Sequence, residues 1–238
     1  MKIVFKKLPL ENNIEIIKWT LFDDGNILSG LRGKTIELIS ELEHVKKEET
    51  KKLEEIVTEK YNEYMKDIDE EIERYTNIWN KYNDDYFKEL ENYLNVKVSF
   101  NEITAYIGLL PVFPRDITDN SFDIAANINK EVLVKVCSHE SLHFYWFTKW
   151  MELYPNTKSN ELEHPHTIWK YSEMVTDPIL NSKTIKDIIK FDNKAYDSFY
   201  TLMDGKEKVM DKLISIYNEN IKIEDKIKKG YTYISSIE

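Results

Sequence analysis

Apolar and polar residues follow a helical period over much of this chain. Apolar residues recur every three or four positions from Pro9 to Phe22, which predicts a helix that ends in a turn at Asp23-Asp24-Gly25. After a loop at Ser29 to Gly33, the same spacing runs from Thr35 to Leu94 without a Gly or Pro. This stretch predicts one long helix or a helical hairpin, and its dense Glu and Lys residues indicate a solvated face.

The pattern becomes strand-like after this stretch. Alternation at Val96 to Phe100 and β-branched or apolar runs at Ile103 to Leu110 and Phe122 to Ile128 predict strands. Asn129 then offers an N-cap for a helix from Lys130 to Tyr154, which a proline stops.

The last third predicts further helices. They are expected at Pro165 to Asp177, Thr184 to Phe191, Lys194 to Met203 and Lys206 to Tyr217, with Gly230 closing the last helix before a tail at Tyr231 to Glu238. The expected fold is therefore α+β and predominantly helical, with a small antiparallel sheet beside the helix of residues 130–154. Residues 1–95 form a helical region and residues 96–238 a core with C-terminal helices, together one compact unit.

Composition narrows the class of protein. The formal charge of −10 argues against a protein that binds nucleic acid or an anionic membrane through a basic surface. The longest uncharged apolar run, Ile103 to Phe113, is well short of the roughly 20 residues of a membrane helix, and no apolar segment follows the N-terminal lysines. The single Cys137 excludes a disulfide framework and a cysteine-based zinc cage. A cytoplasmic protein is expected, and the sequence indicates no particular oligomeric state.

His139-Glu140-Ser141-Leu142-His143 is the motif that carries chemistry. Two imidazoles four positions apart share one face of the predicted helix, so both can reach one Zn²⁺ at about 2.0–2.1 Å. Glu140 projects beside the metal, where it can take a proton from bound water. This HExxH arrangement resembles that of zinc metallopeptidases, which implies hydrolysis of peptide bonds by zinc-activated water. Cys137 lies about 200° around the helix from His139 and is expected to be a buried structural thiol.

A catalytic zinc needs a third protein ligand. Downstream of HExxH, a predicted helix carries Glu173 and Asp177 four positions apart. This pair resembles the Glu-x-x-x-Asp element that accompanies HExxH in the gluzincin metallopeptidases. The resemblance implies a zincin-like core over about residues 96–180, with Glu173 as the third ligand and Asp177 hydrogen-bonded to a ligand imidazole. The rival third ligands are His164 and His166, although the metzincin pattern HExxHxxGxxH is not met. The remaining histidine, His44, is expected to be exposed.

The resemblance also implies a donor for the developing oxyanion and a place for the substrate. The candidate donors are His166, Tyr171, Tyr196 and Tyr200, with Tyr106 and Tyr154 as further options. A peptide or protein substrate would pair with the strand at 122–128, which precedes the HExxH helix. The long N-terminal helix would form one wall or a lid of the cleft.

Two other functions remain open at this point. The chain is alternatively a catalytically inactive zinc-binding or partner-binding module on a peptidase-like scaffold, which would bind metal without hydrolysing peptides. It is otherwise a helical interaction protein built on Thr35 to Leu94, which would hold no stoichiometric zinc.

Overall fold

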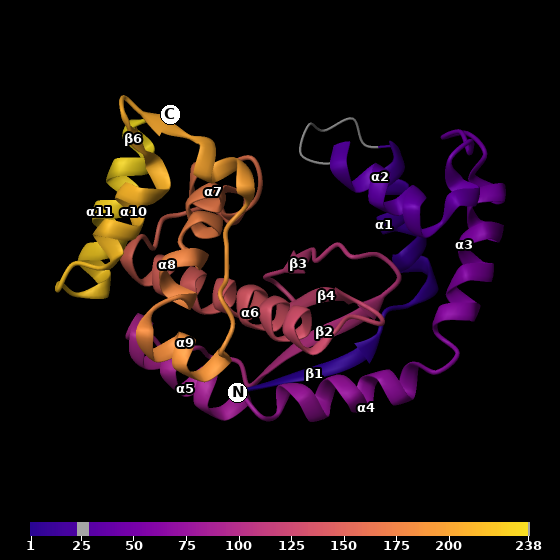
Figure 1. The fold of residues 1–238 in the computed structure, drawn as a ribbon, viewed down its shortest axis with the longest axis horizontal. Coiled ribbons are helices and arrows are strands. Elements are labelled where there is room, and N and C mark those ends of the chain that lie inside the picture. Colours follow the sequence, from indigo (N-terminus) through magenta and orange to yellow (C-terminus); the bar gives the residue numbers. More distant parts are fainter. Residues whose placement is uncertain (23–28, 238) are drawn as a thin grey trace. The chain divides into compact units, whose positions relative to one another are not determined.

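A computed structural model describes residues 1–22 and 29–237 of the chain. It confirms a mostly helical α+β fold with a small sheet (Figure 1). The chain divides into two compact units. The sheet unit comprises residues 2–80 and 102–136, and the helical unit comprises residue 1, residues 81–101 and residues 137–238. The turn expected at residues 23–25 lies outside the described residues, and the division expected after residue 95 stays a prediction.

Four strands in the order β1-β2-β4-β3 form the sheet of the sheet unit (Figure 1). They are β1 (Lys2–Lys7), β2 (Glu102–Gly108), β3 (Arg115–Asp116) and β4 (Ser121–Ala125). Because β1 pairs with β2 and β2 with β4 in parallel, the expected antiparallel sheet is wrong. Within this sheet, β3 and β4 are the antiparallel pair. The chain between β1 and β2 runs through several helices, and such a crossover returns it to the same end of the sheet.

The first strand was not expected from the sequence, and the strand expected at Val96 to Phe100 does not form. In β1, Ile3 and Phe5 are buried while the lysines lie outward, which is the alternation of a half-buried strand. At the other side of the sheet, β3 pairs only with Ser121 and Phe122 of β4. The role of segment 122–128 in substrate binding stays a prediction.

Helices cover the stretch that was expected to be one helix or a hairpin. They are α2 (Ser29–Leu38), a 3₁₀ turn (Ser40–Leu42), α3 (Thr50–Tyr64), α4 (Ile68–Trp79) and α5 (Asn83–Leu94), and they follow α1 (Leu10–Phe22), which confirms the first expected helix. The long helix and the loop at 29–33 are therefore wrong. Met65 caps α3 as a buried residue with φ −94° and ψ 11°, and Tyr82, which precedes α5 in the sequence, is also buried. Packing of these side chains, rather than Gly or Pro, sets the turns.

Helix α4 anchors the turn that leads out of β4. The Tyr75 hydroxyl donates to the carbonyl of Ala125 (2.8 Å) and accepts from the amide of Ile128 (3.1 Å). Arg74 donates to the Ile128 carbonyl at 2.8 Å, and the Glu71 carboxylate accepts from the amide of Asn127 at 2.7 Å. These bonds hold the segment from which the HExxH helix begins.

That helix, α6 (Lys130–Leu153), confirms the predicted one. Asn129 caps it as expected, because its side-chain oxygen accepts from the amide of Val132 at 3.0 Å. The helix begins in the sheet unit and passes into the helical unit between Val136 and Cys137.

Apart from α5, the remaining elements of the helical unit follow α6. They are a 3₁₀ turn (Ser159–Leu162), α7 (Thr167–Met174), α8 (Thr176–Leu180), α9 (Lys183–Ile189), a second 3₁₀ turn (Asp197–Thr201), β5 (Met203–Asp204), β6 (Glu207–Lys208), α10 (Val209–Tyr217) and α11 (Ile223–Ser236). The helix expected at 194–203 is wrong, since this stretch is extended before the 3₁₀ turn and then enters a hairpin whose Gly205 has φ 60°. The tail expected after Gly230 is also wrong, because α11 continues to Ser236.

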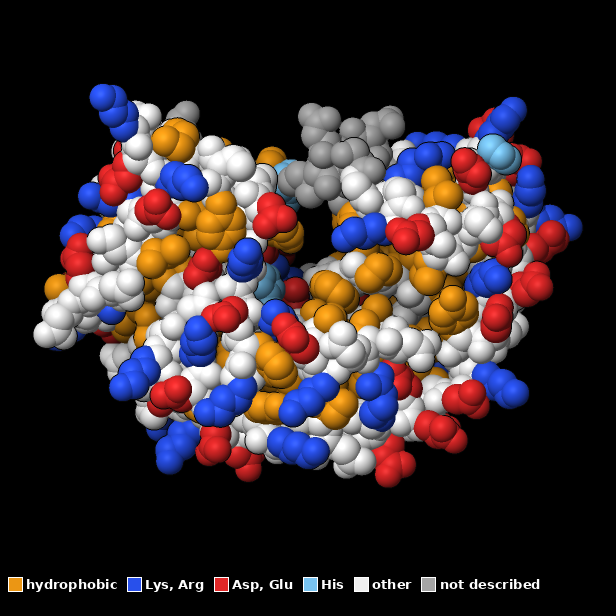
Figure 2. Space-filling view, in the orientation of Figure 1, with side chains coloured by type: hydrophobic (Ala, Val, Ile, Leu, Met, Phe, Trp, Pro, Cys, Tyr) orange, Lys and Arg blue, Asp and Glu red, His pale blue; other side chains and the backbone are white. Residues whose placement is uncertain are grey.

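No helix in the described part of the chain has the length and apolarity needed to cross a membrane. Acidic and basic side chains intermingle over α3 and α4 on the face that Figure 2 shows. This agrees with the solvated helix faces that the sequence indicates.

Candidate metal centre

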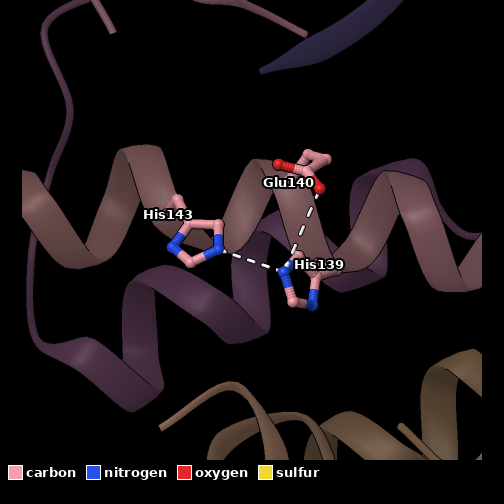
Figure 3. A group of neighbouring side chains, drawn as sticks. All are labelled: His139, Glu140 and His143. Atoms are coloured by element: carbon pink, nitrogen blue, oxygen red, sulfur yellow. Dashed lines mark hydrogen bonds and ion pairs between the residues drawn. The ribbon is translucent and has the colours of Figure 1, made fainter. Parts of the chain in front are cut away.

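His139 and His143 project from one face of α6, one turn apart (Figure 3). Their Nε2 atoms face each other at 3.1 Å. The His143 side chain is 1% exposed, whereas that of His139 is 21% exposed. One imidazole is therefore held in the interior, and the other borders solvent.

Glu140 comes from the same turn of α6 and lies beside the first imidazole (Figure 3). One of its carboxylate oxygens is 4.0 Å from Nε2 of His139, and the side chain is nearly buried. The potential ligand atoms of His139, Glu140 and His143 lie within 4.8 Å of one another. This group is compatible with binding of a metal ion.

A second carboxylate reaches the imidazoles from α7. The Oε2 atom of Glu173 lies 3.2 Å from Nε2 of His139 and 3.5 Å from Nε2 of His143, and the side chain is 1% exposed. With the 3.1 Å between the two nitrogens, these three atoms form a nearly equilateral triangle. Glu173, 30 positions after His143 in the sequence, is therefore brought by the fold to the two imidazoles.

Neighbouring side chains fix the turn of α6 that bears the motif. The hydroxyl of Tyr86, on α5, donates to the carbonyl of Ser138 at 2.6 Å. Cys137 is fully buried, and burial together with the charge of Glu140 raises the pKa of its thiol. The expected structural role of Cys137 agrees with this burial.

Asp177 does not take the position expected for a partner of an imidazole. Its carboxylate accepts hydrogen bonds from the Tyr200 hydroxyl and, at 2.8 Å, from the Asn181 side chain. A break between helices separates Asp177 from Glu173, since α7 ends at Met174 and α8 begins at Thr176.

The expected oxyanion donors occupy different environments. Tyr171 is fully buried with its hydroxyl bonded to Tyr217 and to the Ile227 carbonyl, and Tyr200 is bonded to Asp177. Tyr196 is exposed, and His166 is an exposed residue at the start of α7. The donor stays a prediction.

The other histidines lie outside the metal-compatible group found among the described residues. His164 is exposed, with its ring 4.8 Å from that of Trp169. His44 is 88% exposed, as expected. Neither histidine on the 164–166 segment is part of the triangle around His139 and His143.

Sequence reasoning missed residues that support this part of the fold. Tyr86 donates to the carbonyl of Ser138, and the Tyr217 hydroxyl is bonded to that of Tyr171. Neither Tyr86 nor Tyr217 belongs to a motif, and their partners lie 52 and 46 positions away, so no local signal could have found them.

Comparison of the chain with protein-family models, with curated proteins and with solved structures finds no match. The interpretation of the metal centre therefore depends on its own geometry.

Proposed function

We propose that the chain is a zinc-dependent metallopeptidase with a gluzincin-like ligand set on a zincin-like core. His139, His143 and Glu173 would hold the metal, and Glu140 would act as the general base. The triangle of two imidazole nitrogens and one carboxylate oxygen, with edges of 3.1, 3.2 and 3.5 Å, carries this proposal.

The edges of this triangle fit zinc. A tetrahedral zinc ion with bonds of about 2.0–2.1 Å sets its ligand atoms about 3.3 Å apart. Two neutral imidazoles and one carboxylate are also a ligand set that catalytic zinc sites use, with a fourth position left open. When bound, zinc lowers the pKa of a coordinated water and polarises the scissile carbonyl.

The proposed general base, Glu140, lies farther from His139 than the proposed ligand Glu173 does. Its nearest approach to Nε2 of His139, 4.0 Å, is longer than every edge of the ligand triangle. From there its carboxylate can accept the proton of the attacking water and deliver it to the leaving amine. The proposed substrate is accordingly a peptide or protein.

Metal content and hydrolysis test the proposal separately. We expect the purified chain to contain about one zinc ion per molecule by elemental analysis, and His139→Ala and Glu173→Ala to lose it. Glu140→Gln should retain zinc but fail to hydrolyse a fluorogenic peptide library. Glu131→Gln, an exposed glutamate of the same helix, is the matched control and should change neither quantity.

The contrary outcomes identify which assignment is at fault. Hydrolysis by Glu140→Gln would remove the general-base role. Loss of zinc in His166→Ala, with Glu173→Ala still loaded, would replace the gluzincin-like ligand set. Zinc without hydrolysis of any peptide would leave the inactive metal-binding module, and absence of zinc would leave the helical interaction protein.

A further inference from the structure

Tyr171 joins the two helices that carry the proposed ligands. It belongs to α7 and is fully buried. Its ring packs edge-on against those of Trp146 and Trp150, at centroid distances of 5.4 and 6.4 Å, and both tryptophans lie on α6. The side chain therefore lies at the contact between α6 and α7.

The hydroxyl of Tyr171 extends this contact to the C-terminal helices. It donates to the carbonyl of Ile227 on α11 at 3.1 Å and lies 2.9 Å from the hydroxyl of Tyr217 on α10. Tyr217 is also buried. Because the single proton of the Tyr171 hydroxyl is donated to Ile227, the Tyr217 hydroxyl is the donor between the two tyrosines. The Tyr171 side chain thus connects its own helix α7 with α6, α10 and α11.

Gly230 makes this close approach possible. A Cβ atom at position 230 would lie 2.3 Å from the Tyr171 hydroxyl and 3.0 Å from the adjoining ring carbon. Glycine weakens a helix interior relative to alanine, yet it occupies a buried position within α11. Glycine occupies position 230 because a larger side chain there would overlap the Tyr171 hydroxyl.

Tyr171 and Glu173 are two positions apart and so point about 200° apart around α7. One side chain faces α10 and α11, while the other meets the imidazoles of α6. Fixing the first therefore fixes the rotation of α7 about its axis. Metal–ligand distances tolerate deviations of only about 0.2 Å, so a small rotation would displace Glu173 from the metal.

We propose that Tyr171 is a positioning residue for the metal centre. Held by Tyr217 and seated against Gly230, it sets the rotation of α7 and so places the Glu173 carboxylate against His139 and His143. The C-terminal helices thereby control metal affinity without contributing a ligand. This inference rests on the metal site of the proposed function, but not on its peptidase activity.

Zinc affinity of the full chain tests the inference, measured by competition with a chelating dye. We expect Tyr171→Phe to weaken zinc binding by about tenfold or more, the range seen when supporting partners of metal ligands are removed. Tyr217→Phe should have a smaller effect, because the bond to Ile227 remains. Cobalt substituted for zinc should show an altered visible spectrum in Tyr171→Phe, since ligand geometry governs that spectrum.

Tyr61→Phe is the matched control. Tyr61 is also buried and its hydroxyl also donates to a backbone carbonyl, that of Leu8 at 2.9 Å, but it lies on α3 in the sheet unit. The control should be destabilised without losing zinc affinity or changing the cobalt spectrum. Equal weakening in both variants, or unchanged affinity in Tyr171→Phe, would overturn the positioning role.

Gly230→Ala gives a second, independent measurement. It should weaken zinc binding, and combining it with Tyr171→Phe should weaken binding less than the two effects multiplied, because the 2.3 Å contact with the hydroxyl is gone. Independent, multiplicative effects would contradict the seating of Tyr171 on Gly230. A wild-type chain without zinc would overturn the metal site and this inference together, whereas zinc binding without hydrolysis would contradict only the peptidase.

Discussion

Asn13 is a buried polar residue that ties the start of α1 to the end of two strands. Its side-chain oxygen accepts from the amide of Leu109 at 2.9 Å, and its amide nitrogen donates to the carbonyls of Leu8 and Pro9 at 3.2 and 2.9 Å. Removing the side chain takes the acceptor from the Leu109 amide, whereas the carbonyls of Leu8 and Pro9 keep bonds from the Tyr61 hydroxyl and the Asn13 backbone amide.

We therefore expect Asn13→Ala to lower the free energy of unfolding by about 1–3 kcal/mol, the cost of leaving a buried backbone donor without its acceptor. Urea denaturation followed by circular dichroism measures the change. The exposed neighbour Asn12 provides the comparison, because Asn12→Ala should shift stability little. Similar losses at both positions would contradict the importance of the Asn13 bonds.

Lys149 and Glu224 form a second interior connection, between α6 and α11, with a nitrogen–oxygen distance of 2.8 Å. The hydrogen bond from Lys149 lowers the pKa of Glu224 to about 2, although burial acts in the opposite direction. A depressed carboxyl pKa stabilises the folded chain above the unfolded pKa, 4.5, and this contribution is lost as pH falls toward 2.

Glu224→Gln should accordingly be less stable than wild type at pH 7. The difference in free energy of unfolding should shrink between pH 4.5 and about 2, as the wild-type carboxyl becomes protonated. Urea titrations at several pH values follow this convergence. Asp225→Asn, an exposed change in the same helical turn, should show no such closing gap; a constant difference for Glu224→Gln would exclude the ion pair as its cause.

At this scale the sequence identifies residues whose relation is local. His139, Glu140 and His143 could be predicted as a group because the helix alone sets their spacing. Asp177 could not, since its partner Tyr200 lies 23 positions later, beyond a turn that the sequence does not specify. The proposed metal role of Glu173 was suggested by the resemblance as well as by the spacing.

Among the elements, α6 was predictable because its periodicity is uninterrupted and Asn129 caps it. The stretch from α2 to α5 has similar periodicity and no Gly or Pro, yet it breaks at buried residues such as Met65. Helical propensity does not reveal these breaks, because tertiary packing outweighs it.

Helix α4 offers a test of how one element holds another. Burial by itself raises the pKa of Glu71, but hydrogen bonds from Arg74, Tyr75 and the Asn127 amide lower that pKa overall. The carboxylate therefore stays charged and continues to accept the bond from the Asn127 amide. We expect Glu71→Gln to speed amide hydrogen exchange at Asn127 and Ile128, just before α6. Glu70→Gln, exposed on the same helix, should leave that exchange unchanged; protection that persists in Glu71→Gln would contradict the anchoring.

For the whole molecule, metal binding should increase the free energy of unfolding. A ligand present at 100 times its dissociation constant and bound only to the folded state adds about 2.7 kcal/mol. We expect zinc to raise the thermal midpoint and a chelator to reverse the rise. His143→Ala should abolish the response, and a zinc-induced rise that survives in that variant would place the metal elsewhere.

The parallel sheet shows why whole-chain topology escaped the sequence. Lys2 pairs with Glu102, and Thr104 pairs with Ser121. Each pair of neighbouring strands is therefore joined by a connection of its own, which the strand sequences do not describe. Strand periodicity indicates which face of a strand is buried, but it carries no information on which strand lies beside it.

The interleaving of the two units along the chain has a consequence for the order of synthesis. The sheet unit receives its last residue at Val136, before either imidazole has been translated. His139 and His143 follow, then Tyr171 and Glu173, and Gly230 later still. A nascent chain thus carries both histidines before Glu173 has been translated, so the candidate metal centre can assemble only after the last residue of the sheet unit has been made.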